Sequence, residues 1–338
     1  TGQVLPLDKS AKTIALLGPL LDEGTETAFR EVAPEVDFVT DAGFELTDEN
    51  RSVPTLLGAD AGAMAGLMSK ARTADVVILF LGGDEYTAKE AFFNGAIGDR
   101  ATIEPIGMQD KLITEIKALG KPTIVLLKHR RTLAINVIAE QADAILDAWD
   151  PSEFGDESLA RMVFGDDFPS GRLPVTVPRN IGQLPFHYAG KEINNKKGYL
   201  FMENGPLFPF GYGLSYSAIS YTEPTVSSPT LRPGEEVIVS VVVSNPGEAP
   251  VREVVQCYLK DEIGSVTRPD RELKAFRKID LAPGESKTVR FTVTPEMLRF
   301  TRADMEFGLE AGDYRVFVGP HAATENAATF RLLTEPGR

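Results

Sequence analysis

The chain has 338 residues, enough for two or three domains, and 43% of them are hydrophobic, which is sufficient for ordinary buried cores. Its 49 acidic and 35 basic residues give a net charge of −14, and no cluster of Lys and Arg offers the phosphate contacts that nucleic acid requires. No run of about 18 apolar residues is present, so the sequence contains no candidate membrane span and we expect no membrane partner.

Residues 1–180 alternate short apolar runs with helical patterns. The expected strands are 12–18, 36–43, 76–83, 122–127 and 142–149, and the expected helices lie around 64–71, 108–119, 133–140 and 158–164. The run VVILFLGG (76–83) is continuously apolar, as a strand buried on both faces should be. Strand–helix alternation predicts an α/β sandwich domain, with a mostly parallel sheet, helices on both faces, and ligands at the carboxyl ends of the strands.

The rest of the chain differs from residues 1–180 in composition and in the periodicity of its apolar residues. Residues 181–217 contain many Gly, Pro and aromatic residues with little periodicity, which predicts a long ordered connection. Residues 218–338 contain β-branched runs separated by turn signals such as NPGE and APGE. The run SKTVRFTVT (286–294) alternates apolar and polar side chains, as a half-buried strand does. Short strands of this kind predict an all-β sandwich of the fibronectin type III class.

Three stretches resemble the signatures of one family. They are FGDDFPSGRLPVTVP (164–178), PFGYGLSY (209–216) and RPDRELKAFRKIDLAPGESKTVRFTVTPEMLRF (268–300). They are similar to the FGD-x-x-PSGKLP segment, the junction signature and the RP-x-x-x-LKGF-x-K-x-x-L-x-PGE pattern of family 3 glycoside hydrolases. The resemblance runs from about residue 12 to the end and is closest to bacterial β-glucosidases with a C-terminal fibronectin-like domain. Turn and packing residues dominate these stretches, so we expect them to be structural.

The resemblance implies a reaction. Complete members carry an N-terminal TIM-like barrel before these two domains and hydrolyse β-linked sugars from a non-reducing end with retention. Retaining glycosidases use two carboxyl groups about 5 Å apart, one as nucleophile and one as general acid/base. The family's nucleophile is an Asp on the barrel, which this sequence lacks, and its acid/base is a Glu on a loop of the α/β domain. We therefore expect the isolated chain to be inactive, and its partners to be the barrel, as domain or subunit, and a β-glycoside or oligosaccharide.

The segment DEYTAKEAFFNGAIGDRATIEPIGMQ (84–109) resembles the family's GEAxSRxDLxLPxxQ region, which carries the acid/base. Glu90 with Ala91 matches the Glu-Ala pair, which predicts Glu90 as the general acid/base. Glu85 is the main rival for this role. Gln109 resembles a residue that opens the next helix.

Three further residues of this segment are of interest. Asp99 and Arg100 resemble the family's downstream polar pair, after an insertion, and are candidate substrate-binding residues. Glu104 lies near the start of the next helix, and we expect it to interact with the helix dipole.

Two loops depart from the family pattern. His129-Arg130-Arg131-Thr132-Leu133 stands where relatives read NGRPL, and WDPSEFGDES (149–158) stands where they read WxPGxxGGxA. The altered residues, 129–132 and 152–158, indicate either a site specialised for an unusual sugar or one that has decayed. They leave open an alternative function, a non-catalytic carbohydrate-binding or subunit-interaction module.

We expect the isolated His and Cys residues to have no role in catalysis or metal binding. We expect His129, beside two Arg, to be a surface or interface group, His187 to be a packed loop residue, and Cys257 to be a small buried hydrophobe. The sequence contains no GxGxxG after a strand, P-loop, HExxH, EF-hand loop or GxSxG, so we expect no cofactor and no metal. The resemblance implies a periplasmic or secreted protein, although no signal peptide is present in this chain.

Overall fold

The computed structural model describes residues 4–10, 13–46, 61–84, 87, 100–152, 154–191 and 198–334. The chain divides into two compact units. The α/β unit comprises Thr1–Phe168 and Pro178–Leu184, and the β-sandwich unit comprises Pro169–Val177 and Pro185–Arg338. None of the helices described is long and apolar enough to cross a membrane.

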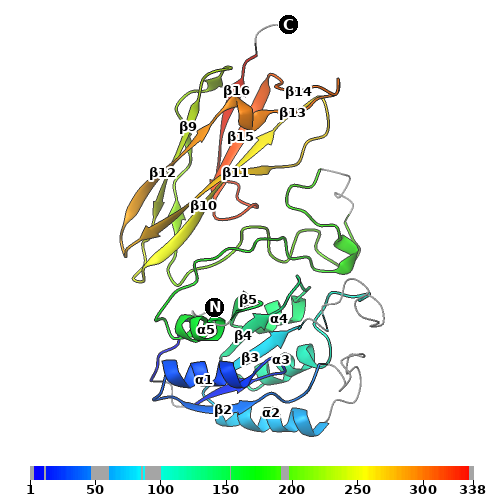
Figure 1. The fold of residues 1–338 in the computed structure, drawn as a ribbon, viewed down its shortest axis with the longest axis vertical. Coiled ribbons are helices and arrows are strands. Elements are labelled where there is room, and N and C mark those ends of the chain that lie inside the picture. The colour runs from blue at the N-terminus through cyan, green and yellow to red at the C-terminus, as the bar shows by residue number, and fades with distance from the viewer. Residues whose placement is uncertain are drawn as a thin grey trace. The chain divides into compact units, whose positions relative to one another are not determined.

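The α/β unit is built on one parallel sheet with the strand order β2-β1-β3-β4-β5 (Figure 1). The strands are β1 (Thr13–Leu17), β2 (Asp37–Asp41), β3 (Val76–Gly82), β4 (Thr123–Lys128) and β5 (Ala144–Trp149). The helices are α1 (Glu23–Val32), α2 (Ala61–Thr73), α3 (Gln109–Lys117), α4 (Asn136–Gln141) and α5 (Gly155–Val163). Helix α1 packs beside α5, whereas α2, α3 and α4 form a second group. The predicted α/β class is confirmed.

The core of this unit follows from the apolar runs. Every residue of β3 is buried, as are the first five residues of β4, because helices cover both faces of the sheet. Met64, Leu67, Met68 and Ala71 form the buried face of α2, as their helical spacing predicts. Phe29, Phe38, Phe80 and Phe164 meet edge to face with ring centroids 5.9–6.4 Å apart. These rings fix α1 against the sheet.

The β-sandwich unit has a five-stranded sheet, β11-β10-β15-β16-β8, and a second sheet, β12-β9-β6, to which β7 also pairs (Figure 1). The main strands are β9 (Val237–Ser244), β10 (Val251–Asp261), β11 (Glu272–Leu281), β12 (Ser286–Val293), β15 (Gly312–Gly319) and β16 (Ala327–Leu332). The short strands are β6 (Ser220–Tyr221), β7 (Thr225–Val226), β8 (Thr230–Leu231), β13 (Phe300–Thr301) and β14 (Phe307–Gly308). Strands β9 and β12 alternate inward and outward residues, so the predicted sandwich is confirmed.

Two of the signature stretches pair with each other inside this unit. Leu173 N–H donates to Tyr212 O at 2.9 Å, and Gly211 N–H donates to Leu173 O at 2.8 Å. Gly211 has φ 79°, and a Cβ on it would lie 2.1 Å from Gln256 Oε1, so only glycine fits there. The stretches are structural, as expected.

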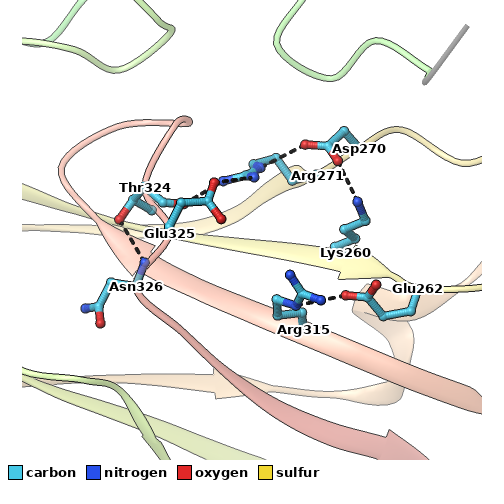
Figure 2. A network of polar contacts seen from close by, with 8 residues as sticks. All are labelled: Lys260, Glu262, Asp270, Arg271, Arg315, Thr324, Glu325 and Asn326. Atoms are coloured by element: carbon cyan, nitrogen blue, oxygen red, sulfur yellow. Dashed lines mark hydrogen bonds and ion pairs between the residues drawn. The ribbon is translucent and has the colours of Figure 1, made fainter. Parts of the chain in front are cut away.

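The third stretch anchors a loop through Arg271 (Figure 2). Its guanidinium lies 4.1 Å from the Phe317 ring centroid and donates to Thr324 O at 2.7 Å. Asp270 accepts from Arg271 at 3.1 Å and from Lys260 at 2.7 Å. The network fastens the segment before β11 to the loop between β15 and β16.

Two single-residue expectations have different outcomes. Cys257 is 1% exposed, and burial raises the pKa of its thiol to about 12, which confirms its role as a small hydrophobe. The expectation for His187 is wrong, because its side chain is exposed. The neighbouring Tyr188 takes the packed position instead and stacks on Phe210 at 4.2 Å between ring centroids.

Candidate functional site

The carboxyl ends of β1, β3, β4 and β5 meet at one edge of the parallel sheet. The strand order reverses between β1 and β3, because β1 is followed in sequence by β2 on one side and β3 lies on its other side. Loops diverge at such a point and leave a crevice, where α/β sheets bind their ligands.

A cleft of about 380 Å³ lies at this edge. We call it the carboxyl-edge cleft. Its lining comes from the ends of β4 and β5, the loops after four strands and the first turn of α5: Pro19, Leu20, Leu21, Asp22, Gly83, Asp84, Lys128, His129, Arg130, Trp149, Asp150, Pro151 and Asp156. Four carboxylates and two permanent cations line it, so the cleft has a net negative charge. The predicted position of a ligand site, at the carboxyl ends of the strands, therefore coincides with a real cavity.

The strand end that leads into the candidate acid/base segment is rigidly held. Gln109 is fully buried at the start of α3, where the sequence predicts the residue that opens this helix. Its side-chain amide donates to Gly82 O at 2.9 Å and accepts from Gly82 N–H at 2.7 Å. A Cβ on Gly82 would lie 1.8 Å from Lys128 O, so glycine is required where β3 and β4 approach.

Lys128 braces the cleft from the end of β4. Its ammonium donates to Thr25 Oγ1 at 2.8 Å and to Asp156 Oδ1 at 3.0 Å, and it lies 3.4 Å from Asp22 Oδ2. These partners stand at the start of α1 and in the first turn of α5, where carboxylates also favour the positive helix end. One largely buried cation thus ties three segments of the cleft together.

His129 is 4% exposed, so the expectation of a surface or interface group is wrong. Its Nε2 lies 2.7 Å from Asp147 Oδ1. Because a carboxylate only accepts, Nε2 carries the proton and Nδ1 is an acceptor in the neutral ring. No group in the described part of the chain hydrogen-bonds Nδ1, which is itself buried. The tight pairing of β4 with β5, which local sequence does not reveal, buries this residue.

Trp149 ends β5 in a strained conformation. Its φ is 55°, a value rare for a bulky residue, and the β4–β5 register shifts just before it. Three contacts hold it: its O accepts from His129 N–H at 2.7 Å, its N–H donates to Asp147 Oδ1 at 3.4 Å, and its ring lies 4.7 Å from the His129 ring. Trp149 is also one of the residues that line the cleft.

Of the candidate catalytic and substrate-binding residues named from the sequence, only Arg100 is among the described residues. Glu90, Glu85 and Asp99 lie outside the described residues. Arg100 is described, and its guanidinium donates to Thr87 O at 3.1 Å and to Glu104 O at 2.5 Å. Desolvation by burial, with the nearby charge of Arg131, lowers the pKa of Arg100.

Glu104 is not part of the first turn of α3, which carries Asp110 instead. Its Oε2 accepts from Ile103 N–H at 3.1 Å. Burial raises the pKa of Asp110, and the charge of Glu104 adds to that increase. The expected interaction of Glu104 with the dipole of this helix stays a prediction.

Sequence reasoning singled out the altered loops but not Lys128, Asp147 or Trp149 as site residues. The signal available was positional, because each stands at or near the carboxyl end of a predicted parallel strand. Nothing in the sequence indicates their pairing, since Asp147 is 18 residues from His129. In the described part of the chain, no group of three or more His, Cys, Asp or Glu side chains could hold a metal ion.

Comparisons with known proteins match both units. The model of the glycosyl hydrolase family 3 C-terminal domain matches residues 1–216, and that of the fibronectin type III-like domain matches residues 253–322. A putative β-xylosidase of Formosa agariphila is 58% identical over 332 residues, which cover 98% of this chain and 44% of that protein. A periplasmic β-glucosidase of Salmonella typhimurium is 40% identical over 273 residues, 78% of this chain and 35% of that protein.

Solved structures give the same match. A β-glucosidase from Erythrobacter marinus superposes with a TM-score of 0.89 at 33% identity, covering 98% of this chain and 48% of its own. A β-glucosidase from Listeria innocua, solved in complex with glucose, has a TM-score of 0.82 at 31% identity, covering 97% and 47%. The matched part of the chain thus covers between 35% and 48% of the length of these relatives.

Proposed function

Because this chain belongs to glycosyl hydrolase family 3 and corresponds to the C-terminal portion of its longer members, we propose that it supplies the general acid/base for retaining hydrolysis of a terminal β-linked sugar. Glu90 is the proposed acid/base, and Glu85 is the rival. The nucleophile, an Asp, is carried by an N-terminal barrel outside this sequence. Within this chain we assign residues 1–180 to the α/β domain, 181–217 to the connection and 218–338 to the fibronectin-like domain.

The observation that supports the proposal is the place where the segment containing Glu90 begins, directly after the carboxyl end of β3. Gly83 and Asp84 line the carboxyl-edge cleft directly after β3, and Gln109 fixes that strand end from the start of α3. Arg100 joins the two sides of the segment, since it donates to the carbonyls of Thr87 and Glu104. The segment between Asp84 and Arg100, which carries the proposed carboxyl group, therefore begins at the sheet edge where α/β sheets bind ligands.

The chemistry requires a carboxyl group that is protonated before the reaction and ionised afterwards. In the first step the acid gives its proton to the leaving oxygen while the nucleophile attacks the anomeric carbon. In the second step the same group, now a carboxylate, takes a proton from the attacking water. The negative charge of a nearby nucleophile and of the cleft carboxylates favours the protonated form at the start.

Substrate and location are also proposals. The two relatives described above are named a putative β-xylosidase and a periplasmic β-glucosidase, so we propose a β-xyloside or a β-glucoside as the substrate class. One relative is named a periplasmic β-glucosidase, which supports a periplasmic or secreted location for this protein.

Exposed apolar side chains support the need for an absent partner domain. In the α/β unit, Phe154 follows β5 and is 70% exposed. In the β-sandwich unit, Tyr199, Leu200 and Phe201 follow one another with exposed fractions of 55%, 86% and 106%. Large apolar side chains that gather at the surface commonly mark an interface. We assign them to contacts with the N-terminal half, without which we expect this chain to be inactive.

The experiment compares two leaving groups on the enzyme assembled from this chain and its N-terminal half. Loss of a general acid is felt most when the leaving group is a poor one, because a good one departs without a proton. Glu90→Gln should lower turnover of alkyl β-glycosides by about 10² to 10⁴-fold and that of dinitrophenyl β-glycosides much less. Glu85→Gln is the matched control. An unchanged rate for Glu90→Gln on alkyl glycosides eliminates the assignment.

A second candidate, a non-catalytic carbohydrate-binding or subunit-interaction module, is favoured by the altered loops 129–132 and 152–158. His129, which pairs with Asp147, and the strained Trp149 lie in or beside these loops. Under this hypothesis the assembled protein binds a glycoside or a protein partner but shows no Glu90-dependent turnover. Calorimetry with sugars and gel filtration with the N-terminal half separate it from the enzyme.

A further inference from the structure

One side chain closes the segment 198–205 of the β-sandwich unit. Asn204 Oδ1 accepts a hydrogen bond from Tyr199 N–H at 3.2 Å. Gly198 has φ 43°, and a Cβ on it would lie 1.9 Å from the same oxygen, so the Asn204 side chain packs directly against this backbone. Asn side chains often close turns by bonding to nearby backbone. Asn204 therefore fastens the loop that carries the exposed aromatic run Tyr199–Phe201.

The residue after Asn204 is a glycine in open surroundings. Asn204 and Gly205 are both exposed, and neither belongs to a helix or a strand. Apart from sequence neighbours, no atom of the described residues lies within 4 Å of the place where a Cβ on Gly205 would be. Because glycine has no side chain, its backbone nitrogen approaches the preceding side chain with little steric hindrance, and its backbone angles adapt at low cost. The Gly205 nitrogen and Asn204 Cγ are thus placed for an intramolecular reaction.

The reaction is deamidation through a cyclic imide. The Gly205 nitrogen attacks Asn204 Cγ, so that an N–Cγ bond forms and the Cγ–Nδ2 bond breaks, and the amide proton of Gly205 leaves with Nδ2 as ammonia. Water then opens the ring at either carbonyl and leaves aspartate or isoaspartate at position 204. Negative charge gathers on Oδ1 during the attack, and the Tyr199 N–H that already donates to this atom stabilises that charge.

The other asparagines of the described residues lack this combination. Three of them precede a residue whose side chain hinders attack by its nitrogen: Asn136, Asn180 and Asn326. Asn245 is fully buried and precedes Pro246, which has no N–H. Asn94 also precedes a glycine, but it lies outside the described residues. Among the described asparagines, Asn204 is therefore the one suited to the reaction.

From these observations we propose that Asn204 is a modification site, which deamidates in the folded chain and thereby opens the loop that carries Tyr199–Phe201. Isoaspartate adds a methylene group to the main chain and shortens the side chain, so the hydrogen bond to Tyr199 N–H is lost. Aspartate keeps the acceptor oxygen and adds a negative charge. The modification is independent of the proposed function. Its effect on association with the N-terminal half rests on that function, which assigns the aromatic run to the interface.

The test ages the folded 338-residue chain in mildly alkaline buffer. Peptide mapping by mass spectrometry follows each asparagine, and labelling by an isoaspartyl methyltransferase detects isoaspartate. We expect conversion at Asn204 and none at Asn180, which is also exposed but precedes Ile181. An intact Asn204 in the aged folded chain overturns the proposal, and so does conversion that occurs only in urea.

Gly205→Ala is the matched variant. The φ of Gly205 lies outside the positive region and the space around it accommodates a methyl group, so the variant should fold. It should convert more slowly at position 204, because the added methyl group hinders the attack. An unchanged rate in the folded variant contradicts the mechanism.

Limited proteolysis with chymotrypsin tests the opening of the loop. Aged wild type should be cut at Tyr199–Phe201 faster than the aged Gly205→Ala chain. Asn204→Asp keeps the acceptor oxygen and should be cut as slowly as fresh wild type. Equal cleavage of the aged wild type and the aged Gly205→Ala chain, despite isoaspartate at position 204, overturns the proposed opening.

Calorimetry with the N-terminal half separates this inference from the proposed function. Aged wild type that is converted at Asn204 and binds more weakly than the aged Gly205→Ala chain supports both. Conversion with an opened loop but unchanged affinity supports the modification and removes Tyr199–Phe201 from the interface. Glu90-dependent turnover of an assembled enzyme whose Asn204 stays intact on ageing overturns the modification alone.

Discussion

Arg172 and Glu253, 81 residues apart in sequence, form a buried ion pair in the β-sandwich unit, with side chains 6% and 1% exposed. Arg172 belongs to the PSGRLP stretch and Glu253 to β10, so the pair fastens the family signature to the sheet. Tyr221 O–H donates to the other carboxylate oxygen, Glu253 Oε1, at 2.9 Å. The signature stretch thus has a structural purpose that its turn-like sequence does not reveal.

Removing one member of this pair should destabilise the sandwich strongly. Arg172→Met leaves a buried, uncompensated carboxylate, and we expect a loss of about 3–5 kcal/mol in the free energy of unfolding. Urea unfolding followed by circular dichroism measures the effect. The double variant Arg172→Met with Glu253→Leu removes both charges and should recover most of the loss. Equal destabilisation of the single and double variants would show that packing, not charge, dominates.

The stability of the α/β unit should fall in acid through Asp143. Although burial opposes the change, Lys117 at 2.5 Å and the N–H of Thr123 at 2.8 Å hold the pKa of this carboxyl below its usual value. A folded-state pKa below the unfolded value gives stability that is present above the unfolded pKa and is lost as the pH falls through the folded one.

Asp143→Asn should therefore cost about 1 kcal/mol at pH 7 and less as the pH falls below about 4. Thermal unfolding between pH 3 and pH 7 measures this convergence. Asp37 is an exposed Asp at the start of β2, and Asp37→Asn serves as the control. A difference between wild type and Asp143→Asn that stays constant with pH would contradict the assignment.

A substitution at Arg100 separates two roles for this residue: holding the acid/base segment in place and contacting the substrate directly. Its guanidinium reaches two carbonyls at once, which the single ammonium of lysine does not reproduce. Arg100→Lys in the assembled enzyme should lower kcat by about tenfold or more, because misplacement of the acid/base segment slows the chemistry. It should also speed proteolytic cleavage between residues 88 and 99. A raised KM with unchanged kcat and unchanged cleavage would instead indicate a substrate contact.

The exposed run Tyr199–Phe201 should contact the N-terminal half of the complete protein. Phe201 has φ 64°, a backbone conformation that is rare and strained for an aromatic residue, and its side chain is fully exposed. Phe201→Ser should weaken association with the N-terminal half by about tenfold or more, the effect expected of an aromatic contact at an interface. Calorimetry of the two halves measures the dissociation constant.

Phe307→Ser, at an exposed aromatic position of β14, is the matched control and should leave the affinity unchanged. Equal affinities for the wild type and Phe201→Ser would remove this surface from the interface. A concentration-dependent dimer of the 338-residue chain that Phe201→Ser abolishes would assign the surface to self-association.

The sequence by itself determined the fold class and the family, but not every element, because helix α1 (Glu23–Val32) was not among the expected helices. Continuous apolar runs such as that of β3 and alternating runs such as that of β12 are local, and each period allows only one kind of burial. The start of α3 was also visible, as the position of Gln109 shows, whereas α4 and α5 begin about three residues away from the expected positions. The family followed from turn and junction stretches, whose residue types are dictated by backbone geometry.

Only the tertiary structure decided which side chains form the carboxyl-edge cleft. His129 was predicted to be a surface or interface group from its two Arg neighbours, but the pairing of β4 with β5 buries it against Asp147 and Trp149. In the sequence Lys128 is an ordinary lysine at the end of a strand. Only the packing of α1 and α5 brings Asp22, Thr25 and Asp156 to it. The physical reason is that a parallel sheet brings together strand ends far apart in sequence, and the contacts between them leave no periodic trace along the chain.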